Sequence, residues 1–265
     1  MEGEKTIKVG MIGFAFMGRA HNNAYHKIPY IFYPAPANIE LVGICGIPEE
    51  AAQEAAKRFN YRYGTSDWRR LVEDPEINYL DNNGPNTVHA EPAIAALEMG
   101  KHVLVEKPLA MTLAEGRAMV KAAAKADGQG VKSMVSFSNR FCPALRLAKR
   151  MIDEGKLGKI FQIRIPFLQD WLVDPSFPLV WRLRKDQAGS GAMGDLNAHS
   201  VDMCRFLLGE ELTRVNCWNK TVINQRPLPS TAWGLSASAS QSTGMGEVDV
   251  DDISFMWLES EGGTL

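Results

Sequence analysis

Three short stretches of this sequence carry residue types that could bind a phosphate or move a proton. The first, GMIGFAFMGRAH at 10–21, contains Gly13 and Gly18, with Ala15 where the G-x-G-x-x-G pattern has its middle glycine. Between a strand and a helix, such a loop brings backbone N–H groups and the positive end of the helix dipole to a pyrophosphate. The methyl group of Ala15 narrows that approach without closing it. The alternative is an ordinary strand-to-helix turn that needs only two glycines.

A lysine and an acid–histidine pair could assist proton transfer. Lys107 ends a predicted strand in VLVEKP (103–108), at the edge where open parallel sheets bind ligands. An ammonium group there stabilises negative charge on a nearby oxygen, whereas the alternative is a surface lysine paired with Glu106. In GDLNAHSVD (194–202), Asp195 and His199 are spaced to share a helix face, which suits general acid–base catalysis. The alternatives are an acid at a helix start beside a structural histidine, or two ligands of a metal site that lacks a third.

Further polar and aromatic residues follow predicted strands or lie in the long loop at 170–191. Long ordered loops are often functional, and aromatic rings with polar neighbours suit a sugar-like substrate. The alternative is a loop that is simply packed by its tryptophans. The residues are Asn86, His89, Asn139, Arg140, Trp171, Asp174, Trp181, Arg182 and Lys185. His21, His26 and His102 receive no functional role, and His21 and His102 are interpreted as structural.

Composition excludes several classes of function. The chain has 265 residues, 45% hydrophobic and 23% charged, with a formal net charge of -2. This balance gives no reason to expect a nucleic-acid or acidic-membrane partner. No apolar run approaches the ~20 residues that span a bilayer, and the N-terminus lacks a signal-peptide core. Four scattered cysteines indicate reduced thiols of a cytoplasmic protein, with neither a metal site nor disulfides.

The first half alternates apolar runs with helical patterns, which predicts a parallel sheet with helical crossovers. Strands are expected at 6–12, 39–45, 77–83, 102–108 and 131–138. Helices are expected from near Met17 to before Pro29, and at 48–59, 87–100 and 112–127. Pro48 would open the second helix, and Thr112 with Glu115 would form a capping box on the last.

The second half predicts a separate α+β unit, which places a boundary near residue 131. Helices are expected at 141–154 and 193–209, and alternating strands at 159–173, 214–223 and 252–260. Such alternation suits an antiparallel sheet with one solvated face. The chain stops soon after Gly262-Gly263, where a hairpin turn has barely begun. We therefore expect that a last strand partner is missing, because the sequence is either a fragment or the product of a truncated gene.

In combination and order, these motifs resemble the glucose–fructose oxidoreductase / inositol dehydrogenase / rhizopine catabolism (Gfo/Idh/MocA) family. The resemblance rests on VGMIGFAFMGRAH, on DPEINYLDNNGPNTVHAEPAIAALEMGKHVLVEKPLA and on AGSGAMGDLNAHSVDMCRFLLG, and it covers essentially the whole chain. It implies an α/β fold: an NAD(P)-binding Rossmann domain (1–131) followed by an α+β domain for substrate binding and oligomerisation (132–265). The second domain would hold a large, open, mostly antiparallel sheet, incomplete here because the chain ends before the family's last strands.

The resemblance also implies an activity and its residues. The chain would transfer a hydride between a secondary alcohol of a sugar or cyclitol and NAD or NADP, with NAD favoured. Gly46 stands where many relatives carry the acid that reads the ribose. The catalytic residues would be Lys107, Asp195 and His199. The cofactor-binding residues would be Gly13, Phe14, Ala15, Phe16, Met17, Gly18, Pro85, Asn86, His89, Glu106, Lys107, Trp181 and Arg182. The substrate-binding residues would be Lys107, Arg140, Trp171, Asp195 and His199.

Two other functions remain open at the level of sequence. Some relatives are glycosidases that use NAD transiently, and a catalytically idle nucleotide-binding protein is a third possibility. The presence of Lys107, Asp195 and His199 together argues against an idle protein, because sequence drift would have replaced at least one of them. The expected absence of the last strands argues for an idle protein. The resemblance further implies a homo-oligomer, a dimer or tetramer, formed through the C-terminal sheet if that sheet is complete. The sequence leaves the substrate and the direction of the reaction unspecified.

Overall fold

The structure is a computed structural model that describes residues 5–229 and 244–265. The chain divides into two compact units, one ending at Ser136 and the other beginning at Phe137. The boundary lies a few residues beyond the one expected from sequence. The difference arises because the strand at Ser133–Ser136 pairs with the strand at His102–Glu106 and so belongs to the first unit.

The first unit contains a six-stranded parallel sheet. Its strands are β1 (Thr6–Ile12), β2 (Asn38–Cys45), β3 (Tyr63–Thr65), β4 (Tyr79–Asn82), β5 (His102–Glu106) and β6 (Ser133–Ser136). Their order is β3-β2-β1-β4-β5-β6, so the chain reverses its direction of travel across the sheet between β1 and β4. In open α/β sheets, ligands bind beyond the carboxyl ends of the strands at this switch point. The short strand β3 was not predicted from the sequence.

Helices connect these strands. They are α1 (Phe16–Ile31), α2 (Glu49–Phe59), α3 (Arg69–Glu73), the 3-10 turn η1 (Asn86–Val88), α4 (Ala90–Glu98) and α5 (Leu113–Asp127). Along β1, Ile12 packs in one buried cluster and Met11 in a second, which shows that both faces of the sheet are covered. The capping box of Thr112 and Glu115 forms as predicted.

Three of these helices depart from the sequence prediction in detail. Helix α1 runs past Pro29 and ends two residues later, so the hydrogen bond that this proline lacks falls in the last turn and leaves the rest of the helix intact. The helix expected at 87–100 is divided into η1 and α4, which meet at His89. Pro48 is the N-cap of α2, one position before the first helical residue.

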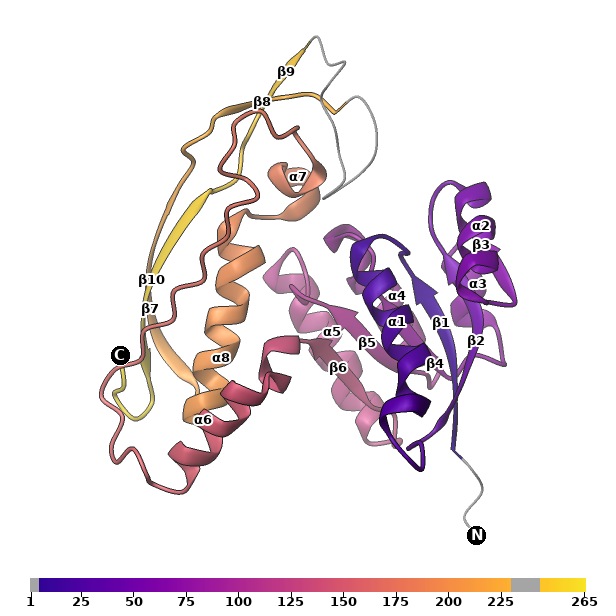
Figure 1. Ribbon diagram of the computed structural model, residues 1–265, viewed down its shortest axis with the longest axis horizontal. Coiled ribbons are helices and arrows are strands. Elements are labelled where there is room, and N and C mark those ends of the chain that lie inside the picture. The colour runs from indigo at the N-terminus through magenta and orange to yellow at the C-terminus, as the bar shows by residue number, and fades with distance from the viewer. Residues whose placement is uncertain (1–4, 230–243) are drawn as a thin grey trace. The chain divides into compact units, whose positions relative to one another are not determined.

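The second unit combines helices with antiparallel strands. Its helical elements are η2 (Ser138–Phe141), α6 (Pro143–Asp153), η3 (Trp181–Leu183), α7 (Lys185–Ala188), the π-helical η4 (Met193–Asn197) and α8 (Ala198–Leu208). Its strands are β7 (Leu212–Lys220), β8 (Gln225–Pro227), β9 (Met245–Glu247) and β10 (Ile253–Ser260). Strand β7 lies beside β10, and β8 pairs with β9 (Figure 1). Within the described residues the strands thus form two two-stranded sheets instead of one large sheet.

The long strand expected at 159–173 is the clearest difference in this unit. No regular strand forms there, although Ile163, Ile165 and Phe167 are half-buried and alternate with exposed neighbours as in a strand. The segment shares only short backbone pairing with the chain end, where Ile163 N–H donates to Leu265 and Leu265 N–H donates to Phe161. The alternating pattern predicted the side-chain directions correctly. It could not supply a neighbouring strand, without which no ladder exists.

One finding bears on membranes. Across the described ranges, none of the helices has the combination of length and apolar character that crossing a bilayer requires.

Candidate functional site

The glycine loop lies at the carboxyl end of β1, beside the switch point. Gly13 has a φ of 84°, and a Cβ atom there would lie 2.6 Å from the backbone oxygen of Asn83. A Cβ atom on Gly18 would lie 2.2 Å from the backbone oxygen of Gly13. The first glycine therefore makes the turn, and the second allows α1 to pack against that turn.

The start of α1 is open to a bound anion. Ala15 is the N-cap residue, and its methyl side chain accepts no hydrogen bond from the first turn. The first N–H groups of a helix have no partner inside the helix and carry partial positive charge. Ala15 and Phe16 are both exposed. This end of the helix therefore retains the property for which dinucleotide-binding loops use it.

The ring of Phe14 explains why no acid follows β2. A Cβ atom on Gly46 would lie 2.2 Å from Phe14 Cε1. The ring thus occupies the space above Gly46, where a side chain would otherwise stand. An aspartate at this position would require the ring of Phe14 to move, so the residues at 14 and 46 depend on each other.

His89 joins two loops at the carboxyl ends of the strands, the side of the sheet that we call the ligand edge. Its side chain is fully buried, with Nδ1 2.8 Å from the carbonyl oxygen of Pro108 and Nε2 3.1 Å from that of Gly84. Burial lowers the pKa of His89, although the two carbonyl contacts act in the opposite direction. The resemblance placed His89 around the nicotinamide ribose. In this structure it is enclosed, so its effect on a ligand would pass through the two loops that it joins.

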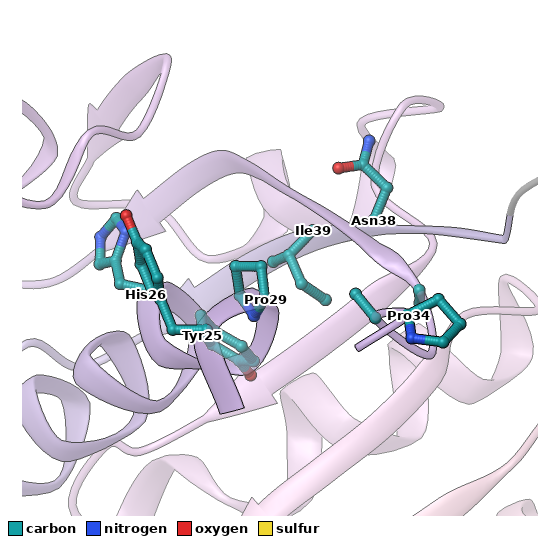
Figure 2. Close-up of a pocket in the computed structure, with 9 residues that line it drawn as sticks. Tyr25, His26, Pro29, Pro34, Asn38 and Ile39 are labelled. Carbon is teal, nitrogen blue, oxygen red and sulfur yellow. The ribbon is translucent and has the colours of Figure 1, made fainter. Parts of the chain in front are cut away.

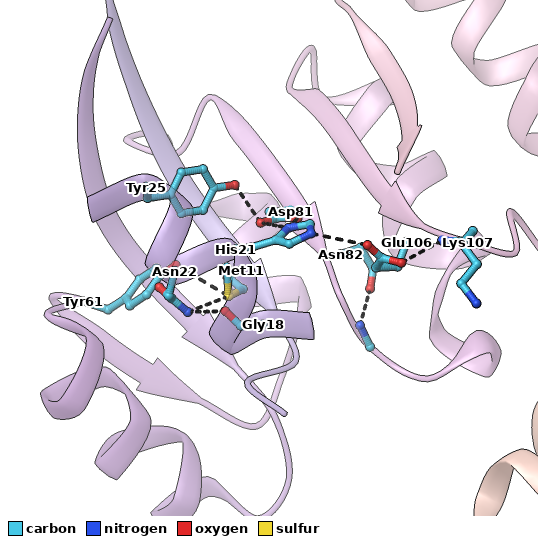
Figure 3. Close-up of polar contacts among 11 residues, drawn as sticks. Met11, Gly18, His21, Asn22, Tyr25, Tyr61, Asp81, Asn82, Glu106 and Lys107 are labelled. Carbon is cyan, nitrogen blue, oxygen red and sulfur yellow. Dashed lines mark hydrogen bonds and ion pairs between the residues drawn. The ribbon is translucent and has the colours of Figure 1, made fainter. Parts of the chain in front are cut away.

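Glu106 is also buried, and it fixes the backbone of the residue beside it. Its side chain is 7% exposed, and Oε2 accepts a hydrogen bond of 3.2 Å from the backbone N–H of Lys107. Figure 3 shows the Lys107 side chain running away from this carboxylate. The expectation of a surface lysine paired with Glu106 therefore holds only for the backbone. The side chain of Lys107 is half-buried and extends away from the Glu106 carboxylate, just beyond the carboxyl end of β5.

Behind Glu106 lies a charged cluster that the sequence reading missed. His21 Nδ1 is 3.0 Å from Asp81 Oδ2, and its Nε2 is 3.3 Å from Glu106 Oε1. The hydroxyl of Tyr25 donates to Asp81 at 2.6 Å. Burial would lower the pKa of His21, but its contacts with Asp81 and Glu106 outweigh that effect and raise it to about 10. Burial would raise the pKa of Glu106, but hydrogen bonds from His21 and Ser136 hold it below its ordinary value.

The second unit carries the acid–histidine pair at a change of helix type. Asp195 lies in η4 and His199 in the first turn of α8, so the segment expected as one α-helix begins as a π-helix. Single π-turns within helices occur frequently at functional sites. The imidazole of His199 stacks on Phe167, with centroids 5.5 Å apart, and meets the edge of Phe137 at 5.8 Å. These two rings hold its plane.

Asp251 anchors the start of this helical segment. Its carboxylate accepts hydrogen bonds from the backbone N–H groups of Gly191 at 2.9 Å and Met193 at 2.7 Å. A Cβ atom on Gly191 would lie 1.9 Å from the backbone oxygen of Asp251. One turn further on, Asn197 Nδ2 donates to Ser254 Oγ at 2.7 Å. The loop before β10 and β10 itself therefore position the turn that carries Asp195.

The other predicted contact residues also have partners within the second unit. Arg140 forms a two-point ion pair with buried Asp202, with distances of 2.7 Å and 2.5 Å. The guanidinium of Arg182 lies over the ring of Trp181, 4.4 Å from its centroid. The Arg140 pair ties η2 to α8, which gives Arg140 a structural role that the sequence did not predict. A direct role in binding ligands stays a prediction for all three.

The long loop is organised by an arginine in addition to its aromatic rings. Arg226 is fully buried and donates to the carbonyl groups of Leu172, Asp174 and Phe177. The ring of Trp171 meets the edge of Phe177 at 5.2 Å. Each carbonyl bond fixes backbone, so this part of the loop has a defined shape. Packing by tryptophans was one of two interpretations of this loop from the sequence, and nothing in the sequence linked Arg226 to it.

A separate cavity lies away from the ligand edge. The cavity has a volume of about 430 Å³. Figure 2 shows the residues that line it, from the second half of α1 to the first residues of β2. Tyr25 and Tyr30 line it, together with Asn38 and Ile39 at the amino end of β2. It is therefore at the opposite end of β2 from the ligand edge. The described parts of the chain contain no cluster of three or more histidine, cysteine, aspartate or glutamate residues that could hold a metal ion.

The cluster around His21 could have been suspected from two signals in the sequence. Asp81 is the one acid in the strand expected at 77–83, and an acid buried in a sheet requires a partner. His21 falls one turn after Gly18, on the face of α1 that must approach the sheet. Asp251 gave no such signal, because its partners are backbone N–H groups sixty and fifty-eight positions away.

The parallel strand order, the switch point between β1 and β4, and the two glycines of the loop define a dinucleotide-binding Rossmann unit joined to an α+β unit. The chain belongs to the Gfo/Idh/MocA oxidoreductase family. The family model for the oxidoreductase family with an NAD-binding Rossmann fold matches residues 7–134, and the model for the GFO/IDH/MocA C-terminal domain matches residues 145–265.

Relatives of known structure or activity support this assignment. A levoglucosan dehydrogenase of Pseudarthrobacter phenanthrenivorans is 45% identical over 249 residues, which are 94% of this chain and 63% of that protein. The solved complex of a levoglucosan dehydrogenase with NADH and levoglucosan has a TM-score of 0.87 at 43% identity, covering 98% of this chain and 65% of the other. An oxidoreductase domain protein from Kribbella flavida has a TM-score of 0.89 at 42% identity, covering 98% and 66%. The chain thus spans just under two thirds of the length of these relatives.

Proposed function

We propose that the protein is an NAD-dependent dehydrogenase that oxidises a secondary alcohol of a sugar or cyclitol, or catalyses the reverse reduction. The observation that carries the proposal is the ligand edge of the first unit. There the glycine loop, the open start of α1 and Lys107 follow β1 and β5, two strands that flank β4. Membership of an oxidoreductase family supports the same activity.

The residues at this edge fit a dinucleotide. The turn at Gly13 and the close packing at Gly18 leave the first N–H groups of α1 facing outward for a pyrophosphate. We propose NAD over NADP because no cationic side chain follows β2, where Gly46, Ile47 and Pro48 stand. Carboxylates also lie near this strand end. Burial is the main cause of the raised pKa of Cys45, and the negative charges of Asp67 and Glu49 raise it further. A 2′-phosphate would meet repulsion there.

When bound, the nicotinamide supplies the hydride acceptor or donor, and the protein supplies position and proton transfer. We propose that His199 accepts the proton of the substrate hydroxyl and that Asp195 orients or shares the charge of the imidazole. The ammonium of Lys107 would stabilise negative charge on the same oxygen. Phe167 and Phe137 hold the His199 ring, and Glu106 holds the backbone at Lys107, so each unit fixes its own reacting group.

Levoglucosan is the first substrate that we propose to test. The relative that is 45% identical is a levoglucosan dehydrogenase, and the second unit of this chain supplies Trp171 and Trp181 in its long loop. Flat apolar rings suit the ring face of a sugar, while polar neighbours suit its hydroxyl groups. We propose the second unit as the substrate domain for this reason.

We also propose that the protein is a homo-oligomer. Ile253, Phe255 and Trp257 alternate along one face of β10, and the register places Trp218 of β7 opposite Phe255 on that face. All four side chains are more than half exposed. A contiguous apolar sheet face of this kind is characteristic of an interface between protein chains.

The test of the activity is a panel of substrates with both nucleotides. Purified protein is mixed with levoglucosan, aldoses or cyclitols and either NAD⁺ or NADP⁺, and the absorbance of reduced nicotinamide is followed. We expect reduction of NAD⁺ with at least one anhydrosugar, aldose or cyclitol. Cleavage of a glycoside without net NADH would instead indicate a glycosidase, and absence of both nucleotide binding and turnover would indicate an idle protein.

A further inference from the structure

We infer that His21 is a positioning residue of the proposed dehydrogenase site: as an imidazolium held between Asp81 and Glu106, it fixes the carboxylate that anchors the backbone of Lys107. The inference deepens the proposed function and rests on it for the role of Lys107. The geometry on which it stands lies wholly within the first unit.

The first step concerns the protons on the imidazole. Each ring nitrogen faces a carboxylate, with Nδ1 3.0 Å from Asp81 Oδ2 and Nε2 3.3 Å from Glu106 Oε1. An ionised carboxylate only accepts hydrogen bonds, so both contacts are favourable only when both nitrogens carry hydrogen. The doubly protonated ring is the cation, which also balances one of the two buried negative charges.

The second step concerns the surroundings of the ring. His21 comes from α1, Asp81 from β4 and Glu106 from β5, so the imidazolium joins three separate elements. Among the described residues, the other titratable groups that face Asp81 are the phenols of Tyr25, which donates to it, Tyr61 and Tyr79. Burial raises the pKa of all three phenols, so they stay neutral. The side chain of His21 is 15% exposed, whereas those of Asp81 and Glu106 are 0% and 7% exposed.

The third step leads to the reacting residue. Glu106 uses one carboxylate oxygen toward His21 and the other toward the backbone N–H of Lys107, at 3.2 Å. The contact at Oε1 is an ion pair and the contact at Oε2 is a hydrogen bond, so together they restrain rotation of the carboxylate. Glu106 therefore links the backbone of Lys107 to His21, and through His21 to α1, the helix that follows the glycine loop. Figure 3 shows this line of contacts from Tyr25 to Lys107.

The test begins with the wild-type protein, so it does not depend on a variant that folds. Nitrogen-15 NMR of the histidine side chains follows the protonation of His21 as the pH is raised. We expect both ring nitrogens of His21 to remain protonated past pH 8. Loss of a ring proton between pH 6 and 8 would overturn the inference. This readout needs no substrate and no turnover, so it is unaffected if the proposed activity fails.

The second measurement uses variants. His21→Gln removes the cation, Glu106→Gln removes its acceptor charge, and His26→Gln removes an exposed imidazole from the same helix as a matched control. Hydrogen exchange of the Lys107 amide, compared with amides in the centre of β4, should lose about tenfold protection in His21→Gln and Glu106→Gln but not in His26→Gln. Unchanged local protection in His21→Gln would contradict the positioning role.

Where the protein is active, kinetics complete the test. His21→Gln should lower kcat about tenfold or more with little change in the KM for NAD⁺, because the group that moves is Lys107, which is proposed to stabilise charge on the substrate oxygen. The double variant His21→Gln/Glu106→Gln should be no slower than Glu106→Gln alone, since both changes act through one carboxylate. Multiplicative losses would show that His21 acts by some route other than Glu106.

Discussion

Three single residues carry the proposed proton chemistry, and each is held by a neighbour that can be named. Glu106 accepts a hydrogen bond from the backbone of Lys107, and Phe167 stacks on His199. Asp195 follows one turn after Gly191, whose backbone N–H donates to Asp251. Proton transfer depends on the placement of a donor or acceptor within a fraction of an ångström. The supporting contacts should therefore matter nearly as much as the reacting groups.

Lys107→Ala and His199→Asn should each lower kcat by about 10²–10⁴-fold, because each removes a group that exchanges or stabilises charge in the transition state. Binding of NADH should remain close to that of the wild type, as measured by fluorescence of the bound nucleotide. Lys121→Ala, which removes an exposed lysine from α5, is the control and should retain full turnover. A Lys107→Ala protein with unchanged turnover would remove Lys107 from the proposed mechanism.

The charge on His21 predicts a specific dependence of stability on pH. The folded-state pKa is about 10, above the ordinary value of about 6.5, so the stabilisation is complete below about pH 6.5 and is lost as the pH rises through about 10. His21→Gln leaves two buried carboxylates with too little positive charge and should lower the free energy of unfolding by about 3 kcal/mol at pH 7. Urea unfolding of both proteins from pH 6 to pH 10.5 measures the difference, which should shrink toward the alkaline end. A difference that is constant with pH would show that the charge of His21 is not involved.

For single residues, the positions of the proposed site residues along the chain were easier to predict from the sequence than the contacts that those residues make. The places of Lys107 after β5 and of Gly13 after β1 could be predicted because strand ends are visible in the pattern. The burial of His89 and the pairing of Arg140 with Asp202 could not, because each depends on residues brought close only by the fold.

Among the elements, the start of α1 has the most restrictive packing. Gly18→Ala should weaken NADH binding by tenfold or more and destabilise the fold by about 1–3 kcal/mol, because its Cβ would lie 2.2 Å from the Gly13 oxygen. Gly116→Ala in α5 is the matched control, since nothing lies within 4 Å of its Cβ position. There we expect a gain of about 0.5–1 kcal/mol. Thermal unfolding and nucleotide titration of both variants measure these effects, and equal effects at the two sites would contradict the packing argument.

The segment from η4 into α8 depends on Asp251 for its position. Asp251→Ala removes the acceptor for two backbone N–H groups and should lower kcat about tenfold or more, while leaving NADH binding in the first unit unchanged. Asp249→Ala is the matched control, because Asp249 accepts from the backbone N–H of Lys185 in α7. Steady-state kinetics and nucleotide titration separate the two. Equal losses of turnover would indicate a general effect of this loop.

Element prediction succeeded where local signals were complete. The apolar runs and the capping box fixed most of the helices and strands of the first unit, whereas the strand at 159–173 required a partner that no local pattern supplies. The π-turn at Met193–Asn197 was also invisible, because its sequence has the periodicity of an ordinary helix start.

For the molecule as a whole, the exposed face of β7 and β10 predicts association. Size-exclusion chromatography with light scattering should give a mass above that of one 29.3 kDa chain at micromolar concentration. Trp257→Lys should shift the protein toward the monomer, since it places a charge within the apolar face. Lys121→Glu, which reverses a charge on the exposed surface of α5 in the first unit, is the control and should leave the mass unchanged. A wild-type protein that is monomeric at all concentrations would contradict the proposed interface.

The overall organisation into a parallel α/β unit and an α+β unit was predictable, because strand–helix alternation in the first half gives way to alternating strands in the second. The position of the boundary was less so, since the assignment of β6 depends on its pairing with β5. The sequence pattern predicted that this strand exists. Its backbone pairing with β5, which forms only in the folded chain, places it in the first unit.

Transfer of hydrogen from substrate carbon to nicotinamide tests the central claim most directly. The protein is incubated with NAD⁺ and levoglucosan deuterated at every ring carbon, and the reduced nucleotide is examined by mass spectrometry. A dehydrogenase that moves hydride directly must place one deuterium from the sugar on the nicotinamide ring, and we predict this result, with loss of product formation in His199→Asn. If NADH forms without deuterium, or if a full panel of deuterated aldoses and cyclitols also yields no reduced nucleotide, the proposed dehydrogenase function is contradicted.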